Sequence, residues 1–118
     1  MASTPIKEDG NWSKRGQPYA LLNFKPGSID EINISSGYPY KKDVDVELKI
    51  GKSKYRLFTQ GEHGWAKDSG TDKKILGLMK SGSKMIVKGI SRKGTYSIDT
   101  YSLKGTSAAY DRLKAICK

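Results

Sequence analysis

Residues 55–91 read YRLFTQGEHGWAKDSGTDKKILGLMKSGSKMIVKGIS and combine a strand, a glycine-rich loop with a tryptophan, a short helix, a tight turn and a second strand. The helix is predicted over 72–80, because apolar residues spaced three and four apart form one buried helical face. Thr71 or Ser69 can cap its start, and Gly82 marks its end. The buried face consists of Ile75, Leu76 and Met79.

The segments around this stretch follow the two-residue period of β-strands. Residues 44–50 alternate apolar and charged side chains, and after the Gly51-Lys52 turn residues 54–59 return, which predicts an antiparallel hairpin over 43–60. Further strands are predicted at 19–24, 28–36, 65–66, 84–91 and 95–101. With a second helix at about 103–117, these strands indicate a mainly β sandwich or barrel, because no βαβ alternation is present.

The length of 118 residues is that of one domain. Residues 1–18 are polar and are predicted to form a loose N-terminal arm that Trp12 could anchor, whereas residues 19–118 form the domain. No apolar run reaches the roughly 18 residues that a membrane span needs. The N-terminus also lacks the apolar core of a signal peptide, which does not establish a cytoplasmic location.

The formal net charge is +10, and the excess is concentrated locally. Residues 73–98 contain seven basic side chains and no acid. Such a field attracts polyanions, although a solvated lysine surface is the plainer explanation. Nucleic acid is a less favoured partner, because lysines far outnumber arginines. The candidate anion-binding surface comprises Lys73, Lys74, Lys84, Lys88, Arg92 and Lys93.

Aromatic side chains are a second candidate site. Tyr38 and Tyr40 lie in GYPYKK, residues 37–42, where two lysines follow the two tyrosines. Their rings could stack on bases or sugars, but sheets also favour half-buried tyrosines. Trp65 is interpreted as a plug of the β-sandwich rather than a ligand contact.

Catalytic and metal chemistry find little support. His63 lies beside Glu62 in a glycine loop and is interpreted as a solvated loop residue. Helix capping accounts for Asp68 and Asp72, and no nucleotide-binding or hydrolase motif occurs. Cys117 is either a small buried apolar residue or the partner of a cysteine outside this chain. The chain is therefore predicted to lack catalytic residues, a metal site and a cofactor, and not to be an enzyme.

Taken in order, three segments, 37–89, 91–105 and 107–118, resemble the bacterial invasion-associated locus B (IalB) family. The likeness spans about residues 15–117, and Thr106 departs from it where a bulky apolar residue is expected. The family pattern falls on Gly37-Tyr38, Leu57-Phe58-Thr59, Trp65-Ala66-Lys67-Asp68, Val87-Lys88-Gly89, Asp99–Gly105 and Ala115-Ile116-Cys117.

The resemblance implies an exported protein of Gram-negative bacteria, located in the periplasm, on the cell surface or secreted. It implies an immunoglobulin-like antiparallel β-sandwich, here of about seven strands with two short helices, and an association with host-cell invasion. It supplies no catalytic residues. Members of this family usually begin further upstream, with an export signal and one or two more strands that can carry a cysteine, so the resemblance implies that Cys117 could pair with a cysteine there.

The leading hypothesis is a non-enzymatic envelope or surface protein whose basic surface binds an anionic partner. That partner would be lipopolysaccharide, an acidic glycan or another host surface component. The alternative is a small basic β-module that binds single-stranded nucleic acid. A third possibility is a binding or inhibitor domain that uses the 60–70 loop as its tip. The oligomeric state is not predicted.

Overall fold

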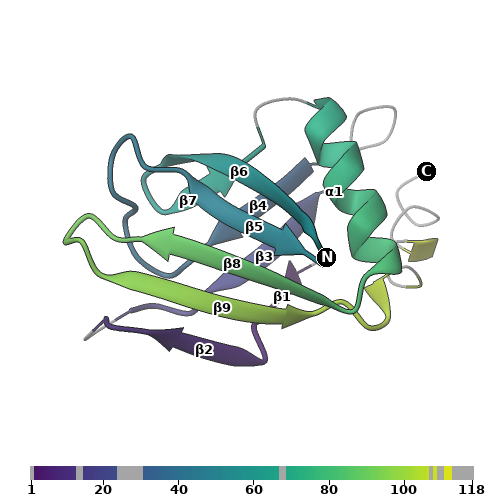
Figure 1. Ribbon diagram of the computed structural model, residues 1–118, viewed down its shortest axis with the longest axis horizontal. Coiled ribbons are helices and arrows are strands. Elements are labelled where there is room, and N and C mark those ends of the chain that lie inside the picture. Colours follow the sequence, from purple (N-terminus) through teal and green to yellow (C-terminus); the bar gives the residue numbers. More distant parts are fainter. Residues whose placement is uncertain are drawn as a thin grey trace.

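The computed structural model describes residues 2–12, 15–23, 31–66, 69–106, 108 and 111–112. It is mainly β, and the helix named among these residues, α1 (Ser69–Ser81), packs at one end of the strands (Figure 1). In chain order the elements are β1 (Ala2–Ser3), β2 (Lys7–Gly10), β3 (Tyr19–Asn23), β4 (Glu31–Ser35), β5 (Val46–Ile50), β6 (Ser53–Gln60), β7 (His63–Trp65), α1 (Ser69–Ser81), β8 (Lys84–Ile90) and β9 (Tyr96–Ser102).

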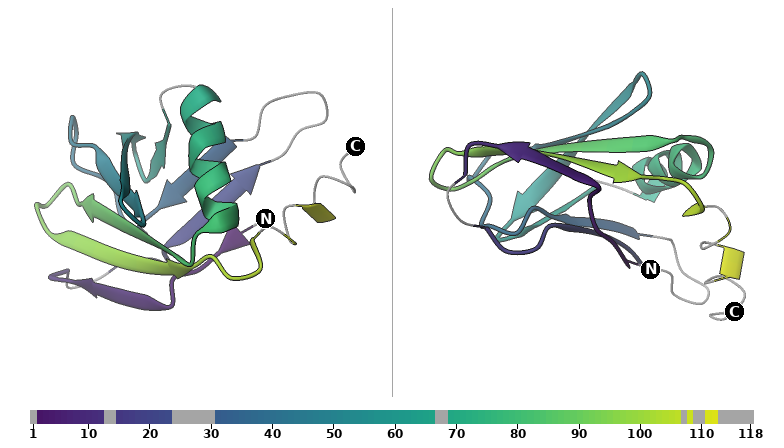
Figure 2. Two further views of the ribbon diagram at one scale, coloured as in Figure 1. Left: turned by 45° about the vertical axis from the view of Figure 1, so that its right-hand side comes forward. Right: turned by 90° about the horizontal axis from the view of Figure 1, so that it is seen from below.

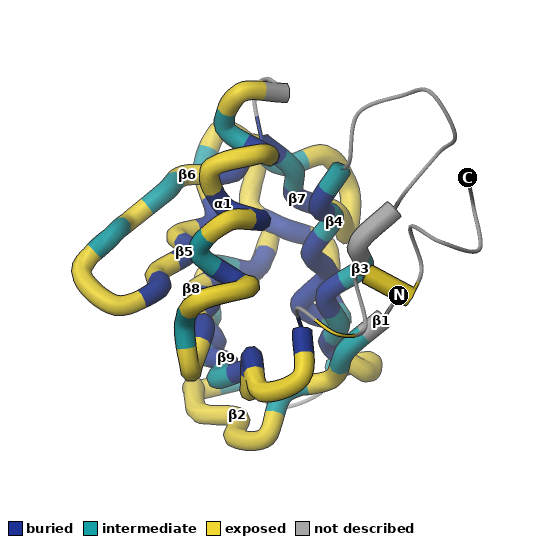
Figure 3. Tube along the Cα trace, turned by 90° about the vertical axis from the view of Figure 1, so that its right-hand side faces the viewer, coloured by how far each residue is buried: buried dark blue, intermediate teal, exposed yellow. Residues whose placement is uncertain are grey.

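The nine strands form one antiparallel sheet in the order β1-β3-β4-β7-β6-β5-β8-β9-β2. The sheet curls into a half-barrel, so that β3 and β4 face β8 and β9 across the core (Figure 2). Viewed along the curl, buried residues line the inside of the half-barrel and exposed residues the outside (Figure 3).

The immunoglobulin-like sandwich expected from the sequence is not confirmed, because the two halves of the sheet are continuous. β6 is the joining strand: its residues 53–57 pair with β5, and its residues 58–60 pair with β7. The seven predicted strands correspond to β3–β9, and the hairpin predicted over 43–60 is confirmed as β5 and β6.

The core follows the predicted alternation. Val46, Leu48 and Ile50 of β5 are buried, while Glu47 and Lys49 between them are exposed. On β8, Met85 and Val87 are buried but Ile86 is exposed, so β8 is covered on one face only, not on both. Apolar burial on the inside of the curl is the main force that holds it closed.

The helix is longer than the predicted 72–80, and its apolar residues Ile75, Leu76 and Met79 are buried as predicted. Asp72, whose negative charge the helix dipole is expected to favour, also links α1 to the sheet. Its Oδ1 accepts a hydrogen bond of 3.2 Å from the backbone N–H of Ile32 on β4. This contact fixes α1 against the end of β4 that β7 does not reach.

The described N-terminal residues, 2–12 and 15–18, do not form the loose arm expected from the polarity of residues 1–18. β1 pairs with β3, and β2 pairs with β9, so one short segment supplies the two outer strands of the sheet. Backbone hydrogen bonds hold this segment in the sheet, so its side chains need not be apolar. For this reason the sequence shows no apolar alternation there. All four residues of β2 are exposed.

Of the helix predicted at about 103–117, residues 106, 108, 111 and 112 are helical and residues 103–105 are not, while the remaining residues, Cys117 among them, lie outside the described part of the chain. Leu103 is buried but not helical, because it precedes a turn in which Gly105 has a φ of +82°. Thr106, which departs from the family pattern, is buried, and its N–H donates to the Leu103 carbonyl at 3.1 Å. Within the described parts of the chain, no helix has both the length and the apolar character needed to cross a bilayer.

Candidate anion-binding pocket

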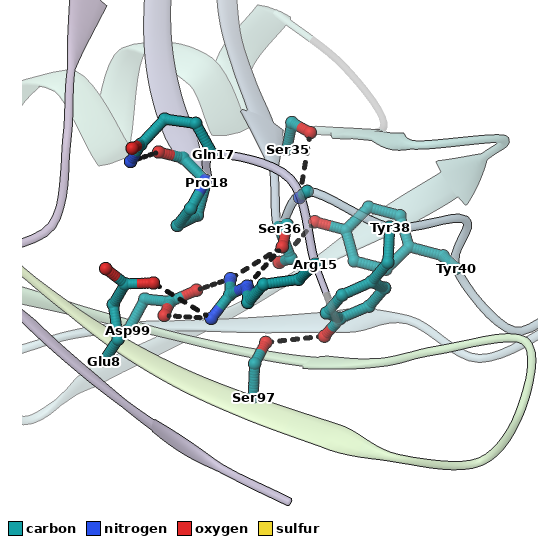
Figure 4. Close-up of polar contacts among 11 residues, drawn as sticks. Glu8, Arg15, Gln17, Pro18, Ser35, Ser36, Tyr38, Tyr40, Ser97 and Asp99 are labelled. Atoms are coloured by element: carbon teal, nitrogen blue, oxygen red, sulfur yellow. Dashed lines mark hydrogen bonds and ion pairs between the residues drawn. The ribbon is translucent and has the colours of Figure 1, made fainter. Parts of the chain in front are cut away.

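A buried ion pair joins Arg15, in the stretch before β3, to Asp99 of β9. The Arg15 guanidinium donates to both carboxylate oxygens of Asp99, at 2.9 and 2.8 Å (Figure 4). The side chains are only 4% and 1% exposed. Arg15 also donates twice to the Ser36 carbonyl, at 2.9 and 2.6 Å, and lies 3.5 Å from a Glu8 carboxylate oxygen. Every guanidinium nitrogen therefore has a protein partner.

Aromatic rings complete the surroundings of this arginine. Its guanidinium lies 4.4 Å from the centre of the Trp12 ring and 5.6 Å from that of Tyr38. Burial alone would lower the pKa of Arg15, but the hydrogen bonds and charge of Asp99 outweigh it and raise the pKa above its ordinary value. Arg15 is therefore a charged group that is paired with Asp99 inside the protein.

The two candidate stacking residues are part of the core. Tyr38 and Tyr40 are each 6% exposed, and their rings meet edge to face at 5.6 Å. The Tyr38 hydroxyl shares a hydrogen bond of 2.5 Å with Ser97, and the Tyr40 hydroxyl one of 2.7 Å with Ser36. Burial of both rings leaves neither of them as an exposed stacking platform, although Tyr38 also lines the pocket described below.

Gly89 on β8 explains how both rings are accommodated. A Cβ at this position would lie 2.8 Å from the Tyr38 hydroxyl and 2.8 Å from a Tyr40 ring carbon. Glycine is therefore required where the two tyrosines cross the inner face of β8.

A pocket of about 360 Å³ lies beside this cluster. Three segments form its walls: the stretch before β3, the loop after β4 and the turn between β8 and β9. The loop is tied to the other two by hydrogen bonds from Gly16 N–H to the Gly37 carbonyl, 2.7 Å, and from Arg92 N–H to the Pro39 carbonyl, 2.9 Å. The lining residues are Arg15, Gly16, Gly37, Tyr38, Pro39, Ser91, Arg92, Lys93 and Thr95.

The β8–β9 turn places two cations at this pocket. Ser91 and Thr95 close the turn through hydroxyl groups 2.6 Å apart, and Gly94 adopts a φ of +91° between them. Arg92 and Lys93 are exposed at the tip, and neither forms an ion pair with a carboxylate of a described residue. The pocket lining contains no acid. The two side chains can therefore meet an incoming anion without first leaving a protein partner.

The other predicted cations do not join them. Lys73 and Lys74 lie on α1, at the opposite end of the molecule from the β8–β9 turn (Figure 1). Lys84 begins β8 near that helix, and Lys88 pairs in register with Glu47 of β5. All six side chains are exposed, but the structure separates them into distinct regions instead of one surface.

The aromatic loop of residues 60–66 also differs from expectation. Trp65 does not plug the core: it is half-buried and stacks on the 43%-exposed Phe58, with ring centres 5.0 Å apart. His63 is exposed, as predicted, and its Nδ1 lies 3.0 Å from the Asn33 side-chain oxygen. In the described residues, no three His, Cys, Asp or Glu side chains gather as a metal site.

Sequence reasoning missed Arg15, Gly16, Ser91 and Thr95 as pocket residues. Arg15 carried no local signal, because its partners come from distant segments. The turn at 93–94 was predicted, but its position beside Pro39 depends on the pairing of Tyr40 with Ser91.

Comparison with known proteins gives one match. A family model described as "Invasion associated locus B (IalB) protein" matches residues 7–114. No curated protein and no solved structure matches the chain.

Proposed function

The chain belongs to the invasion associated locus B (IalB) family, and from this membership we propose that it is an exported, non-enzymatic protein of a Gram-negative bacterium. It acts in the periplasm, on the cell surface or after secretion, in a process connected with host interaction. Its role is to bind an anionic partner such as lipopolysaccharide or an acidic glycan. We also propose that the half-barrel is related to immunoglobulin-like sandwiches, because its two sheet halves face each other across one core.

The observation that carries the binding proposal is the pair Arg92 and Lys93 beside an acid-free pocket. A cation that already has a carboxylate partner gains little from a second anion, whereas a free one gains a full charge-assisted contact. Lys88, by comparison, lines a separate hollow with Asp43, Asp45 and Glu47. The pocket region therefore has the field that attracts anions, and the middle of β8 does not.

The residues of the family pattern maintain the fold, which leaves the binding role to residues outside that pattern. Gly89 makes room for Tyr38 and Tyr40, and Asp99 holds Arg15. These contacts are those of fold maintenance. Among the described residues, no ion pair engages the charged groups of Arg92 and Lys93, so they are available for a partner.

The nucleic-acid alternative is weaker than its sequence suggested. It relied on Tyr38 and Tyr40 to stack on bases, and both rings are buried. Without a stacking platform, lysine contacts alone would give only sequence-independent binding to phosphate.

The proposal is tested with two double variants of equal charge change. Arg92→Gln/Lys93→Gln removes the pocket cations, and Lys73→Gln/Lys74→Gln removes two cations from α1. Binding to lipopolysaccharide vesicles and to heparin is measured at two salt concentrations. The pocket variant is expected to bind more weakly and with a shallower salt dependence than the α1 variant. Equal losses in the two variants would show that only net charge matters.

Export is tested separately in the source bacterium. The product of the natural gene is followed by cell fractionation with an antibody against this domain. Recovery in the periplasm, outer membrane or medium is expected. Recovery in the cytoplasm alone would contradict the export proposal.

A further inference from the structure

We infer that the pocket beside the β8–β9 turn binds a single anionic sugar unit, one pyranose ring that carries a carboxylate or a phosphate. This inference rests on the proposed function and narrows the anionic partner to a ligand class. Its basis is the combination of volume, wall chemistry and charge at one place.

The volume selects a ligand of one ring. Ligand pockets commonly span roughly 300–1,000 Å³, and about 360 Å³ places this one near the lower limit. A free phosphate would leave most of that space empty. A chain of several sugar units would not fit within it, so a polymer can present only one unit, such as a terminal residue.

The walls suit a flat body with hydroxyl groups. Pro39 and Tyr38 supply ring carbons, and Gly16 and Gly37 bring the backbone to the surface without side chains. The carbonyls of Gly37 and Pro39 each accept one backbone hydrogen bond from a described residue, and each oxygen has a second lone pair that can accept another. The hydroxyls of Ser91 and Thr95 add acceptors at the same wall.

The charge lies at one side of the pocket only. Arg92 and Lys93 occupy the turn, whereas Arg15, which lies in the stretch before β3, is already paired with Asp99. The anionic group of the ligand is therefore expected at the turn, with its ring against Pro39. The Arg92 fork can hold a carboxylate or a phosphate through two parallel hydrogen bonds, and Lys93 acts as a point charge.

The pocket is also held in shape before a ligand arrives. The Gly16–Gly37 and Arg92–Pro39 backbone bonds and the Ser91–Thr95 hydroxyl contact join its three walls. A pocket formed in advance avoids the ordering cost that loops otherwise add to binding.

The test is titration of the protein with glucuronic acid, glucose 6-phosphate and glucose, monitored by amide NMR shifts and calorimetry. Dissociation constants roughly in the millimolar range are expected for one or both acids, from the size of the ligands. Shifts are expected at Gly37, Gly94 and Thr95 and not along α1. Arg92→Gln should weaken binding roughly tenfold, Arg92→Lys less, and the exposed control Lys74→Gln not at all. The ratio between the two acids identifies the anionic group.

Three outcomes would overturn the inference. Glucose that binds as tightly as the acids would remove the role of charge, and shifts confined to α1 would place the site elsewhere. If neither acid binds, while heparin binding still depends on Arg92 and Lys93, the proposed function stands and the single-ring ligand is wrong. If heparin binding is also independent of these residues, both proposals fail. Unchanged melting temperatures establish that the variants are folded.

Discussion

Arg15 and Asp99 are 84 positions apart in the sequence and form a two-point ion pair inside the half-barrel. The pair joins the segment before β3 to β9, and the contacts of Arg15 with Ser36 bring in the end of β4. Three regions that share no strand pairing at this point are thereby held together. Arg15, the cation of this pair, also lines the pocket.

Asp99→Asn should strongly destabilise the protein, because it leaves the Arg15 charge buried without its main partner. The loss of one member of a buried pair typically costs roughly 3–5 kcal/mol. Arg15→Met should be similarly costly, whereas Arg15→Met/Asp99→Leu should cost less than the two single changes combined. The free energy of unfolding from urea titration measures all three.

A surface ion pair supplies the control for this prediction. Lys7 and Asp9 on β2 are exposed, with charged atoms 3.5 Å apart, so Lys7→Ala should change stability by less than ~1 kcal/mol. An Asp99→Asn effect as small as this would mean that water reaches the Arg15 cluster.

Alanine substitutions at Gly89 and Gly77 should change the stability of the protein in opposite directions. Gly89→Ala places a methyl group 2.8 Å from atoms of Tyr38 and Tyr40, so it should destabilise by about 1–3 kcal/mol, the usual cost of overpacking. Gly77→Ala on the exposed face of α1 meets no atom within 4 Å and should stabilise by roughly 0.5–1 kcal/mol. Thermal unfolding compares the two, and a neutral Gly89→Ala would show that the tyrosines can move aside.

The strands and α1 were predictable because their signals are local. The alternation in residues 44–50 and the apolar spacing of Ile75 and Met79 each reflect one side exposed to water and one side buried. β2 was not predictable by this means. It is an outer strand with both faces exposed, held by backbone hydrogen bonds that any residue type can make.

The candidate site was predictable only in part. Arg92 and Lys93 were included because charge can be counted along a sequence. Their separation from Lys73 and Lys74 depends on the length and direction of β8, and the burial of Tyr38 depends on Gly89 across the sheet. These positions depend on which distant strands pair with each other. The alternation of apolar and polar residues within one segment does not contain that information.

Asp72 on α1 and Ile32 on β4 provide a test of how the helix is attached. Asp72→Ala should cost about 1–3 kcal/mol, because it leaves the buried Ile32 N–H without this acceptor. The Ile32 amide should then exchange with solvent faster than in the unmodified protein, measured by hydrogen exchange. Asp72→Asn keeps an acceptor oxygen and should retain most of the protection. Equal exchange rates of the Ile32 amide in all three proteins would show that the Asp72 contact does not attach the helix to β4.

The buried tyrosines predict a loss of stability at alkaline pH. Burial raises the pKa of Tyr38, Tyr40 and Tyr101 above the ordinary value of 10.0. Above that pH the unfolded chain releases protons that the folded chain retains, so the free energy of unfolding falls as pH rises. Below it, these groups contribute no pH dependence. Urea titrations between pH 8 and 11 should show a decline that begins near pH 10, and a flat profile would contradict it.

Tyr40 and Tyr101 should respond in opposite ways to loss of the hydroxyl group. The Tyr40 hydroxyl bonds to Ser36, so Tyr40→Phe leaves a buried Ser36 hydroxyl without this partner and should cost about 1 kcal/mol. Tyr101 is 1% exposed, and its hydroxyl has no hydrogen-bond partner among the described residues. Tyr101→Phe removes this unmet group and should leave the protein equally stable or more stable by up to ~1 kcal/mol. Urea titration at pH 7 measures both changes. A marked loss in Tyr101→Phe would mean that a buried water bonds this hydroxyl in solution.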